Sequence, residues 1–370
     1  MPKPCPSHQL SKPGFDGEWV RLEDLLTEYK ELNVGNRYRP VAVGRFGIRA
    51  REDIYTKELA KDYSKNKVIH QNTLTVGMGS KQIDIGILTS EDRYSVSPAY
   101  HTYRIGEVDC DYLRYCLEAR NADMFKRFAK RGTRQGKTID LKRWLGYRIY
   151  LPSKERQVAV VRRLDAIERQ IDDCKSMGQR LDDLVKSQFV EMFGELAPSV
   201  SLASICELFT DGDWIESKDQ SIGGIRLLQT GNVGNGKFRN KGDKARYITG
   251  ETFDRLQCKD VLAGDILISR LPDPVGRACA VPESLGRCIT AVDCSILRLK
   301  PEWNVSFVVW FTRTADYENQ IREYLTGTTR KRISRSNLGK IKIPAADSEL
   351  QQQFADFVAR VDKLAFNQSD

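Results

Sequence analysis

One stretch of the sequence has the spacing of a nucleotide-binding motif but lacks two of its parts. Gly231 to Lys237 fits the pattern G-x-x-x-x-G-K of a phosphate-binding loop. The next residue is Phe238, where a Ser or Thr should hold Mg²⁺. The polar, glycine-containing segment that follows does not favour the helix whose N-terminus would bind the phosphate. We therefore interpret this stretch as a hairpin loop.

Two further stretches look like enzyme motifs, and both are incomplete. Ser97-Pro98-Ala99-Tyr100 is similar to the S-P-P-Y motif of adenine methyltransferases, but it lacks the second proline. No glycine-rich turn for S-adenosylmethionine accompanies it, so we interpret it as a turn beside a buried tyrosine. Glu216-Ser217-Lys218 has the E-x-K form of metal-dependent nucleases. Asp211 and Asp213 are too close in sequence to supply the converging carboxylate that metal-assisted hydrolysis needs.

Histidine and cysteine usage argues against a metal site and for a reducing compartment. The chain has only three histidines, and its nine cysteines are scattered without a C-x-x-C pair. Met1 to Asp16 is polar and proline-rich, which is not typical of a signal peptide. No apolar run approaches the roughly 20 residues that would cross a membrane. The sequence therefore predicts a cytosolic protein with no metal of its own.

The net charge predicts a polyanionic partner. Lys and Arg number 59 against 50 Asp and Glu, which gives a formal net charge of +9 and a pI near 9.0. A hydrophobic content of 40% over 370 residues is enough for two or three domains with real cores.

The basic residues cluster at two places that resemble each other. Asp111 to Arg131 and Trp303 to Tyr324 each have the apolar content of a helix, and each is followed by a turn with Gly, Thr and Arg. A run of cations is usually only a solvated surface. Because this one recurs at the same place in both halves, we predict that it contacts phosphates. The candidates are Lys130, Arg131, Thr133, Arg134 and Lys137 in the first half, and Thr328, Thr329, Arg330, Lys331, Arg332 and Arg335 in the second.

One long helix, Ser153 to Phe193, should connect these halves. Pro152 precedes it and Gly194 follows it, and about 40 residues give a length of roughly 60 Å. Its apolar residues follow a four-three spacing typical of a helix that pairs with another helix. The alternative is a helix that lies on one domain surface. The residues of this apolar stripe that we expect to pair are Leu164, Ile167, Ile171, Leu181 and Val185.

The expected partner is a shorter helix at the C-terminus. Its apolar residues repeat the four-three spacing, and Ser348 with Gln351 has the form of a capping box at its start. The residues that should face the long helix are Phe354, Phe357, Val361 and Leu364.

These features together indicate an internal duplication. Leu145 to Pro152 precedes the first helix, and the similar Leu338 to Pro344 precedes the second. The predicted fold class is α/β, in the form of two mixed (α+β) modules separated by the long helix, which pairs antiparallel with the shorter one. The expected segments are a polar N-terminus (1–16), a first module (17–152), the long helix (153–194), a second module (199–344) and the C-terminal helix (345–370).

Over nearly its whole length the chain resembles the specificity subunit of type I restriction-modification systems. The resemblance rests on several short sequence segments that occur together in this order along the chain, and no single motif decides it. The pieces are 13–19 (PGFDGEW), 149–152 (IYLP) with Glu155 and Gln157, 187–194 (SQFVEMFG), 264–270 (GDILISR), 276–277 (GR), 343–344 (IP) and 350–355 (LQQQFA).

The resemblance implies a DNA-reading subunit without catalysis of its own. Each module would be a target-recognition domain for one half of a bipartite DNA site. Two modification subunits would dock on the helices and methylate adenine with S-adenosylmethionine, and restriction subunits with ATP and Mg²⁺ would cleave. This chain would carry no cofactor. Further candidate DNA contacts are Lys237, Arg239, Lys241, Arg270 and Arg277, of which Arg270 and Arg277 lie in segments that resemble the family.

One departure and two alternatives accompany this interpretation. The family's second helix is usually comparable in length to the first, whereas here it is short. A truncated specificity protein that acts only as a coiled-coil adaptor would also fit that helix. A self-sufficient methyltransferase or nuclease would require a cofactor motif that the sequence does not show.

Overall fold

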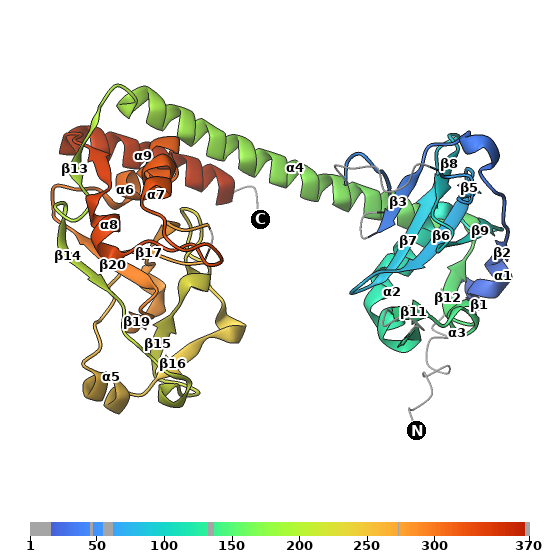
Figure 1. Ribbon diagram of the computed structural model, residues 1–370, viewed down its shortest axis with the longest axis horizontal. Coiled ribbons are helices and arrows are strands. Elements are labelled where there is room, and N and C mark those ends of the chain that lie inside the picture. The colour runs from blue at the N-terminus through green and yellow to red at the C-terminus, as the bar shows by residue number, and fades with distance from the viewer. Residues whose placement is uncertain (1–15, 45–46, 55–61, 132–136, 273, 367–370) are drawn as a thin grey trace. The chain divides into compact units, whose positions relative to one another are not determined.

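The computed structural model describes residues 16–44, 47–54, 62–131, 137–272 and 274–366. The chain divides into two compact units, residues 1–171 and 172–370, each with its own hydrophobic core (Figure 1). The division falls inside α4 (Lys154–Phe193), which is one continuous helix. The prediction of a single long helix over 153–193 is therefore confirmed.

Unit 1 is built on a four-stranded antiparallel sheet in the order β2-β9-β6-β7. One face packs against α2 (Cys110–Phe128), because Leu74 and Val76 of β6 share a core with Leu113 and Leu117 of the helix. The remaining elements close the unit around this core. The strands are β2 (Leu26–Glu28), β6 (Thr73–Met78), β7 (Ile83–Leu88) and β9 (His101–Ile105), and the closing elements are β1 (Gly17–Arg21), α1 (Leu22–Leu25), β10 (Ala129–Arg131), β11 (Lys137–Ile139), α3 (Leu141–Leu145) and β12 (Arg148–Pro152).

Unit 2 repeats this frame. Its four-stranded antiparallel sheet has the equivalent order β14-β20-β17-β18, and β13 pairs with β21 as β1 pairs with β12. The shared arrangement of sheet, helix, hairpin and closing strand pair is called the frame below. Its elements are β13 (Pro198–Ser201), β14 (Cys206–Asp211), β17 (Ile266–Ser269), β18 (Ala278–Ala280), β20 (Cys294–Leu299), α6 (Val305–Phe311), α7 (Ala315–Glu323), α8 (Arg335–Lys340), β21 (Lys342–Pro344) and α9 (Ser348–Phe366).

Each frame carries an insert on the sheet face opposite its helices. Insert 1 is residues 29–72 and insert 2 is residues 212–265. Successive side chains of a strand point to opposite faces of the sheet, as strand β17 illustrates. Ile266 and Ile268 belong to the core on the helix side, while Leu267 belongs to the cluster formed with insert 2. The elements of insert 1 are η1 (Val34–Asn36), β3 (Val41–Gly44), β4 (Gly47–Ala50) and β5 (Lys67–Ile69), and those of insert 2 are η2 (Ser217–Asp219), β15 (Ile225–Leu228), η3 (Thr230–Asn232), η4 (Gly242–Lys244), β16 (Arg246–Ile248) and α5 (Gly250–Leu256).

The inserts differ in topology although the frames agree. In unit 1, β5 pairs antiparallel with β8 (Tyr94–Val96), and β3 and β4 form a separate hairpin. In unit 2, β15 pairs parallel with β19 (Cys288–Thr290) and antiparallel with β16, and 3₁₀ helix η5 (Glu283–Leu285) precedes β19. The duplication seen in the sequence therefore holds for the frame and stops at the inserts.

Three local predictions were wrong: side-chain bonds to the backbone account for two of them, and strand pairing of β10 with β11 accounts for the third. The helix expected over 303–324 breaks into α6 and α7, where the Thr314 hydroxyl donates to Phe311 O (2.8 Å) and accepts from Tyr317 N (3.3 Å). The helix expected over 111–131 ends at Phe128, and 129–131 form β10. The cap of α9 is Asp347, whose carboxylate accepts from Leu350 N (2.8 Å), so Ser348 is not the N-cap.

Candidate nucleic-acid interface

The basic turn of unit 2 is a short hairpin, residues 326–332, that points its cations into solvent. Thr326 and Arg332 exchange two backbone hydrogen bonds of 2.9 Å each. Gly327 has φ +92°, and a Cβ there would lie 2.4 Å from Arg330 O, so this tight turn requires glycine. Thr328, Thr329, Arg330, Lys331 and Arg332 are exposed, and none of the three cations forms an ion pair within the described residues. The hairpin therefore presents three free cations.

Arg270 holds this hairpin, which favours a positioning role over the DNA contact predicted for it. Its guanidinium donates to Val292 O (2.6 Å) and Ile333 O (3.3 Å), and its Nε lies 3.2 Å from the Asp211 carboxylate. The side chain is 15% exposed. Ile333, the residue after the hairpin, also donates its N–H to Arg270 O (3.3 Å). Arg270 is therefore a positioning residue that joins the hairpin to the end of β17.

Arg277 is partly exposed and also makes contacts within the unit, and its role as a DNA contact stays a prediction. Its guanidinium donates to Ser269 Oγ at 3.3 Å, its Nε is buried, and Gly276 beside it packs against Ile321 of α7. The other candidate cations of this region have exposed side chains, namely Lys237, Arg239 and Lys241. Arg335 in the first turn of α8 is exposed as well.

The segment Gly231 to Lys237 is a hairpin loop, as we interpreted it from the sequence. Val233 and Phe238 form an antiparallel bridge, and Gly234 N donates to Lys237 O (3.0 Å). Gly236 N donates to Ala278 O of β18 (2.9 Å), which attaches the loop to the frame. The loop precedes no helix, so it has no amide cluster at a helix N-terminus for a phosphate.

Unit 1 has the equivalent hairpin, β10–β11, between α2 and α3. Lys130 lies 3.6 Å from the Asp140 carboxylate but stays 56% exposed. Lys137 lies over the Phe125 ring (4.7 Å to its centroid) and near Ser80 O (3.4 Å) at the β6–β7 turn. Thr133 and Arg134 lie outside the described residues, and so does the Arg131 side chain. The structure thus places a basic hairpin at the same position of both frames.

Two buried glutamines contact the N-caps of α2 and α6, the first helical elements after each sheet, and the sequence did not reveal their role. Gln157 of α4 accepts from Asp109 N (2.8 Å) and donates to Pro152 O (2.9 Å). Gln351 of α9 accepts from Asn304 N (2.8 Å) and donates to Ala346 O (2.8 Å). Asp109 and Asn304 are the N-caps of α2 and α6. Each glutamine therefore ties a spacer helix to a helix of the frame that lies upstream of the basic hairpin. The sequence signal was the I-x-x-P pattern in both halves followed by a glutamine, five residues after Pro152 and seven residues after Pro344.

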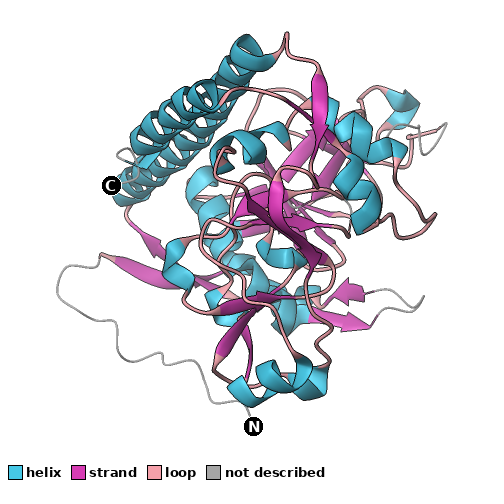
Figure 2. Cartoon of the chain, turned by 90° about the vertical axis from the view of Figure 1, so that its left-hand side faces the viewer, coloured by secondary structure: helices cyan, strands magenta, loops and turns pink. Residues whose placement is uncertain are grey.

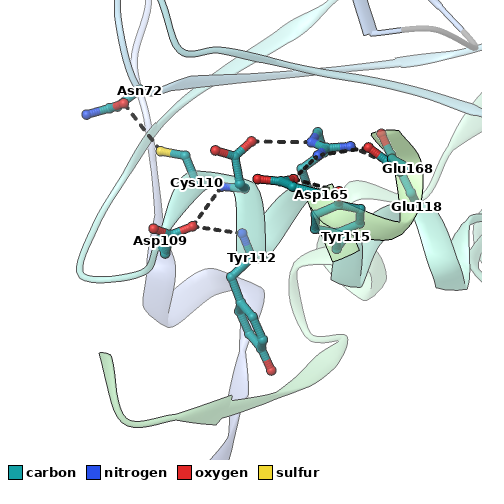
Figure 3. Close-up of polar contacts among 10 residues, drawn as sticks. Asn72, Asp109, Cys110, Tyr112, Tyr115, Glu118, Asp165 and Glu168 are labelled. Atoms are coloured by element: carbon teal, nitrogen blue, oxygen red, sulfur yellow. Dashed lines mark hydrogen bonds and ion pairs between the residues drawn. The ribbon is translucent and has the colours of Figure 1, made fainter. Parts of the chain in front are cut away.

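Further polar contacts tie α4 to each unit. In unit 1, the Tyr115 hydroxyl donates to Asp165 (2.8 Å), and Arg114 lies 3.8 Å from both Asp165 and Glu168 (Figure 3). Burial and the Asp165 carboxylate raise the pKa of Tyr115 to about 12. In unit 2, Arg313 pairs with Asp182. Burial would raise the pKa of Asp182, but Arg313 and Lys186 outweigh it and hold that pKa below its ordinary value.

The C-terminal part of α4 pairs antiparallel with α9, as both views show (Figures 1 and 2). Val185, Phe354 and Val361 are buried in one cluster, and Leu181 and Phe357 pack against it. The strongest anchors were not in the predicted stripe. Phe189 and Phe193 are 5% and 1% exposed and lie 5.3 and 5.6 Å from the Phe354 ring.

The other part of the predicted pairing stripe is open in this chain. Ile167 and Ile171 are 50% and 48% exposed, Leu364 is 56% exposed, and Leu164 is partly buried outside the cluster. The reason is length, because α9 has 19 residues and α4 has 40. Residues 166–180 of α4 are all exposed. Pairing of Leu164, Ile167 and Ile171 with α9 is therefore corrected.

Neither remaining enzyme-like motif forms a catalytic arrangement in the described residues. Glu216 and Lys218 pair with each other at 2.9 Å, and Asp213 accepts from Lys259 N at 2.9 Å. Tyr100 N donates to Ser97 O at 3.0 Å, which is the predicted turn. Within the same residues no group of three or more His, Cys, Asp or Glu could hold a metal ion, and no helix is long and apolar enough to cross a membrane.

Comparisons with known proteins agree with this geometry. Residues 198–369 match the family described as type I restriction modification DNA specificity domain. One solved chain, from a study of complex assembly and conformational transition of the type I R-M system, is 16% identical with a TM-score of 0.52, and the match covers 96% of this chain and 93% of that chain. The type I restriction-modification S subunit from M. genitalium is 13% identical with a TM-score of 0.53, and the match covers 97% and 92%. A search of the curated proteins found no match. These similarities confirm the fold class.

Proposed function

Because residues 198–369 carry a type I restriction modification DNA specificity domain and the whole chain has the fold of a type I S subunit, we propose that it is the DNA sequence-recognition subunit of such a complex. Each unit reads one half of a bipartite double-stranded target. The chain itself contributes recognition and no catalysis. Its compartment is the cytosol, where its DNA and its partner subunits are found.

The observation that carries this proposal is the repeated basic hairpin. Both frames place a hairpin with exposed cations after a helix whose N-cap a buried glutamine contacts, directly after α2 in unit 1 and after α6 and α7 in unit 2. Phosphate contacts need cations that are exposed, unpaired and held at a defined position. Arg330, Lys331 and Arg332 meet all three conditions, because Arg270 anchors their hairpin and no acidic residue pairs with them in the described chain.

The helices provide the surface for the other subunits. Residues 166–180 of α4 are exposed and contain the half-exposed Ile167 and Ile171, an apolar stripe that α9 is too short to cover. Two modification subunits dock along this helix pair, and restriction subunits join that complex. S-adenosylmethionine, ATP and Mg²⁺ belong to those subunits in this proposal.

A charge reversal of Arg330, Lys331 and Arg332 to Glu tests the proposal. Binding of the full chain to a duplex with its target and to a random duplex is measured over a range of salt concentrations. The variant should lose affinity on both duplexes, and the salt slope should fall by about three, since each lost phosphate contact releases about one counterion fewer. Lys363→Glu, an exposed reversal on α9, is the matched control and should leave the slope unchanged. An unchanged slope in the triple variant would show that the hairpin does not contact DNA.

The short α9 favours one second candidate, a truncated specificity protein that serves as a helical adaptor. An adaptor would bind the modification subunits but would show no sequence preference on DNA. Mapping methylated adenines in DNA from the native host separates the two functions, because only the recognition subunit yields a defined bipartite site.

A further inference from the structure

The two inserts are the parts of the chain that differ most between the units. The frames repeat strand order, the N-caps of α2 and α6, and the buried glutamines. The inserts share neither their pairing pattern nor their cores, since β5–β8 is antiparallel and β15–β19 is parallel. Elements common to both units can serve what both half-sites have in common, the phosphate backbone. Only elements that differ can distinguish two unlike half-site sequences.

The exposed apolar side chains follow the same division. Away from α4 and α9, large apolar side chains that are exposed in the described chain gather in the inserts, and Trp19 and Leu196 are the ones outside them. Exposed apolar groups gain nothing from folding, so such a concentration indicates a binding surface. The side chains in the inserts are Leu32 (46%), Val34 (71%), Ile54 (47%), Trp214 (69%), Ile222 (102%) and Leu262 (48%).

Buried polar groups hold the loop of insert 2 that carries Trp214 and Ile222. Asp213 is 9% exposed and accepts from Lys259 N (2.9 Å), while its own N–H donates to Thr290 O (2.8 Å). Asp219 is 8% exposed and accepts from Glu216 N (3.1 Å) and Arg255 (2.6 Å). The loop is therefore fixed on both sides of Trp214 although the Trp214 ring itself is exposed.

The end of this loop is fixed in the same way. Ser221 N donates to Tyr247 O of β16 (2.8 Å), and Ser221 Oγ donates to Gly223 O (2.8 Å). Gly224, with φ +121° and a would-be Cβ 2.5 Å from Ile248 O, turns the chain into β15. Ile222 stands between these fixed points with its whole side chain in solvent. A fixed backbone that presents unsupported apolar groups is suited to a partner that supplies apolar contacts at defined positions.

Insert 1 repeats the arrangement with different residues. Asn33 is 1% exposed and bonds Tyr38 N (2.9 Å), Tyr38 O (3.0 Å) and Tyr63 O (3.3 Å). Its neighbours Leu32 and Val34 point outward on the rigid turn that Asn33 holds. In both units a buried polar residue thus fixes a loop whose neighbouring apolar residues are exposed.

We infer that these insert loops read the base edges of the target, with Trp214 and Ile222 as specificity-determining residues for the half-site of unit 2 and Leu32 and Val34 for that of unit 1. The inference rests on the proposed function. Thymine methyl groups in the major groove are the apolar feature that double-stranded DNA offers to such side chains. Figure 1 shows α5, β15 and β16 at the end of unit 2 that is farthest from α9, which leaves the helix pair free for protein partners.

The test uses the full chain assembled with its modification subunits, after methylation mapping of the wild type has defined both half-sites. Trp214→Ala and Ile222→Ala are compared with Leu196→Ala, an exposed apolar truncation outside the inserts. Duplexes carrying single base-pair changes in one half-site measure discrimination, and a random duplex measures non-specific binding. Failure of the wild type to yield a bipartite site would overturn the proposed function and this inference with it, whereas a bipartite site with unaltered discrimination in the variants would overturn the inference alone.

The insert variants should lose about tenfold or more discrimination at one or two positions of a single half-site, with random-duplex binding unchanged. Val34→Ala should do the same in the other half-site only, and Leu196→Ala should change neither. Thermal midpoints equal to the wild type confirm that the loops remain folded. Unchanged discrimination in both Trp214→Ala and Ile222→Ala would overturn the inference, and so would an equal loss on the random duplex.

Discussion

Replacing Arg270 with glutamine should destabilise unit 2 while leaving the salt slope of DNA binding nearly unchanged. The substitution removes the cation beside Asp211 and at least one of the two bonds to Val292 O and Ile333 O. Asp211 keeps a hydrogen bond from Ser295 Oγ (2.8 Å), so it does not become wholly unpartnered. Since Arg270 is 15% exposed, water can replace only part of what is lost.

The magnitude follows from these contacts. A buried acceptor without a partner costs about 1–3 kcal/mol, and breaking a buried ion pair costs about 3–5 kcal/mol. Partial exposure and the Ser295 bond reduce the sum, so we expect a loss of about 2–4 kcal/mol. For a unit of this size that lowers the thermal midpoint by roughly 4–16 °C. Affinity for DNA should fall moderately because the hairpin loses its anchor, yet its three cations remain.

Arg330→Gln is the matched control, because it removes the same charge from an exposed and unpaired side chain. It should lower the salt slope by about one and leave the thermal midpoint unchanged. Thermal denaturation and salt-dependent binding are measured for both variants. If Arg270→Gln instead lowered the slope by about one at an unchanged midpoint, Arg270 would be a direct phosphate contact and the positioning role would be refuted.

Three further predictions concern the helices. Gln157→Ala and Gln351→Ala should each cost about 2–4 kcal/mol in chemical denaturation, because each leaves a buried N–H and C=O unpaired; a loss below about 0.5 kcal/mol would contradict this role. Arg313 and Lys186 lower the pKa of Asp182 in the folded chain. The ionised Asp182 therefore stabilises the fold at any pH above the ordinary pKa of Asp, and this stabilisation is lost as the pH falls through the lowered pKa of the folded state. The gap in thermal midpoint between wild type and Asp182→Asn should therefore close below about pH 4, and a constant gap would exclude the linkage. Four residues added within 166–180 of α4 lengthen the helix by about 6 Å and should change the spacer between the half-sites by about two base pairs. An unchanged spacer in methylation mapping would show that the length of α4 does not set the distance between the half-sites.

The sequence by itself determined the long helix, the repeated frame and the position of the basic turns. These are local properties, because helix periodicity, a preceding proline and a following glycine act within a few residues. The bounding Pro152 and Gly194 predicted the length of α4 correctly, and the repeat of Leu145 to Pro152 at Leu338 to Pro344 predicted that β12 and β21 have equivalent places. Phosphate contact by the hairpins remains a prediction, supported by their exposure.

Only the tertiary structure decided which cations are free. Arg270 and Arg330 are alike as residues, but Arg270 is surrounded by Asp211, Val292 and Ile333, which lie 22 to 63 residues away along the chain. The same reason hid the pairing of Gln157 and Gln351 with caps that lie 48 and 47 residues away, respectively. It also hid the exposed residues of the inserts, because an apolar residue in a loop becomes a surface feature only when the fold leaves it uncovered. The burial of a side chain and its hydrogen-bond partners depend on segments that are distant in sequence and close in space, so a local sequence pattern does not predict them.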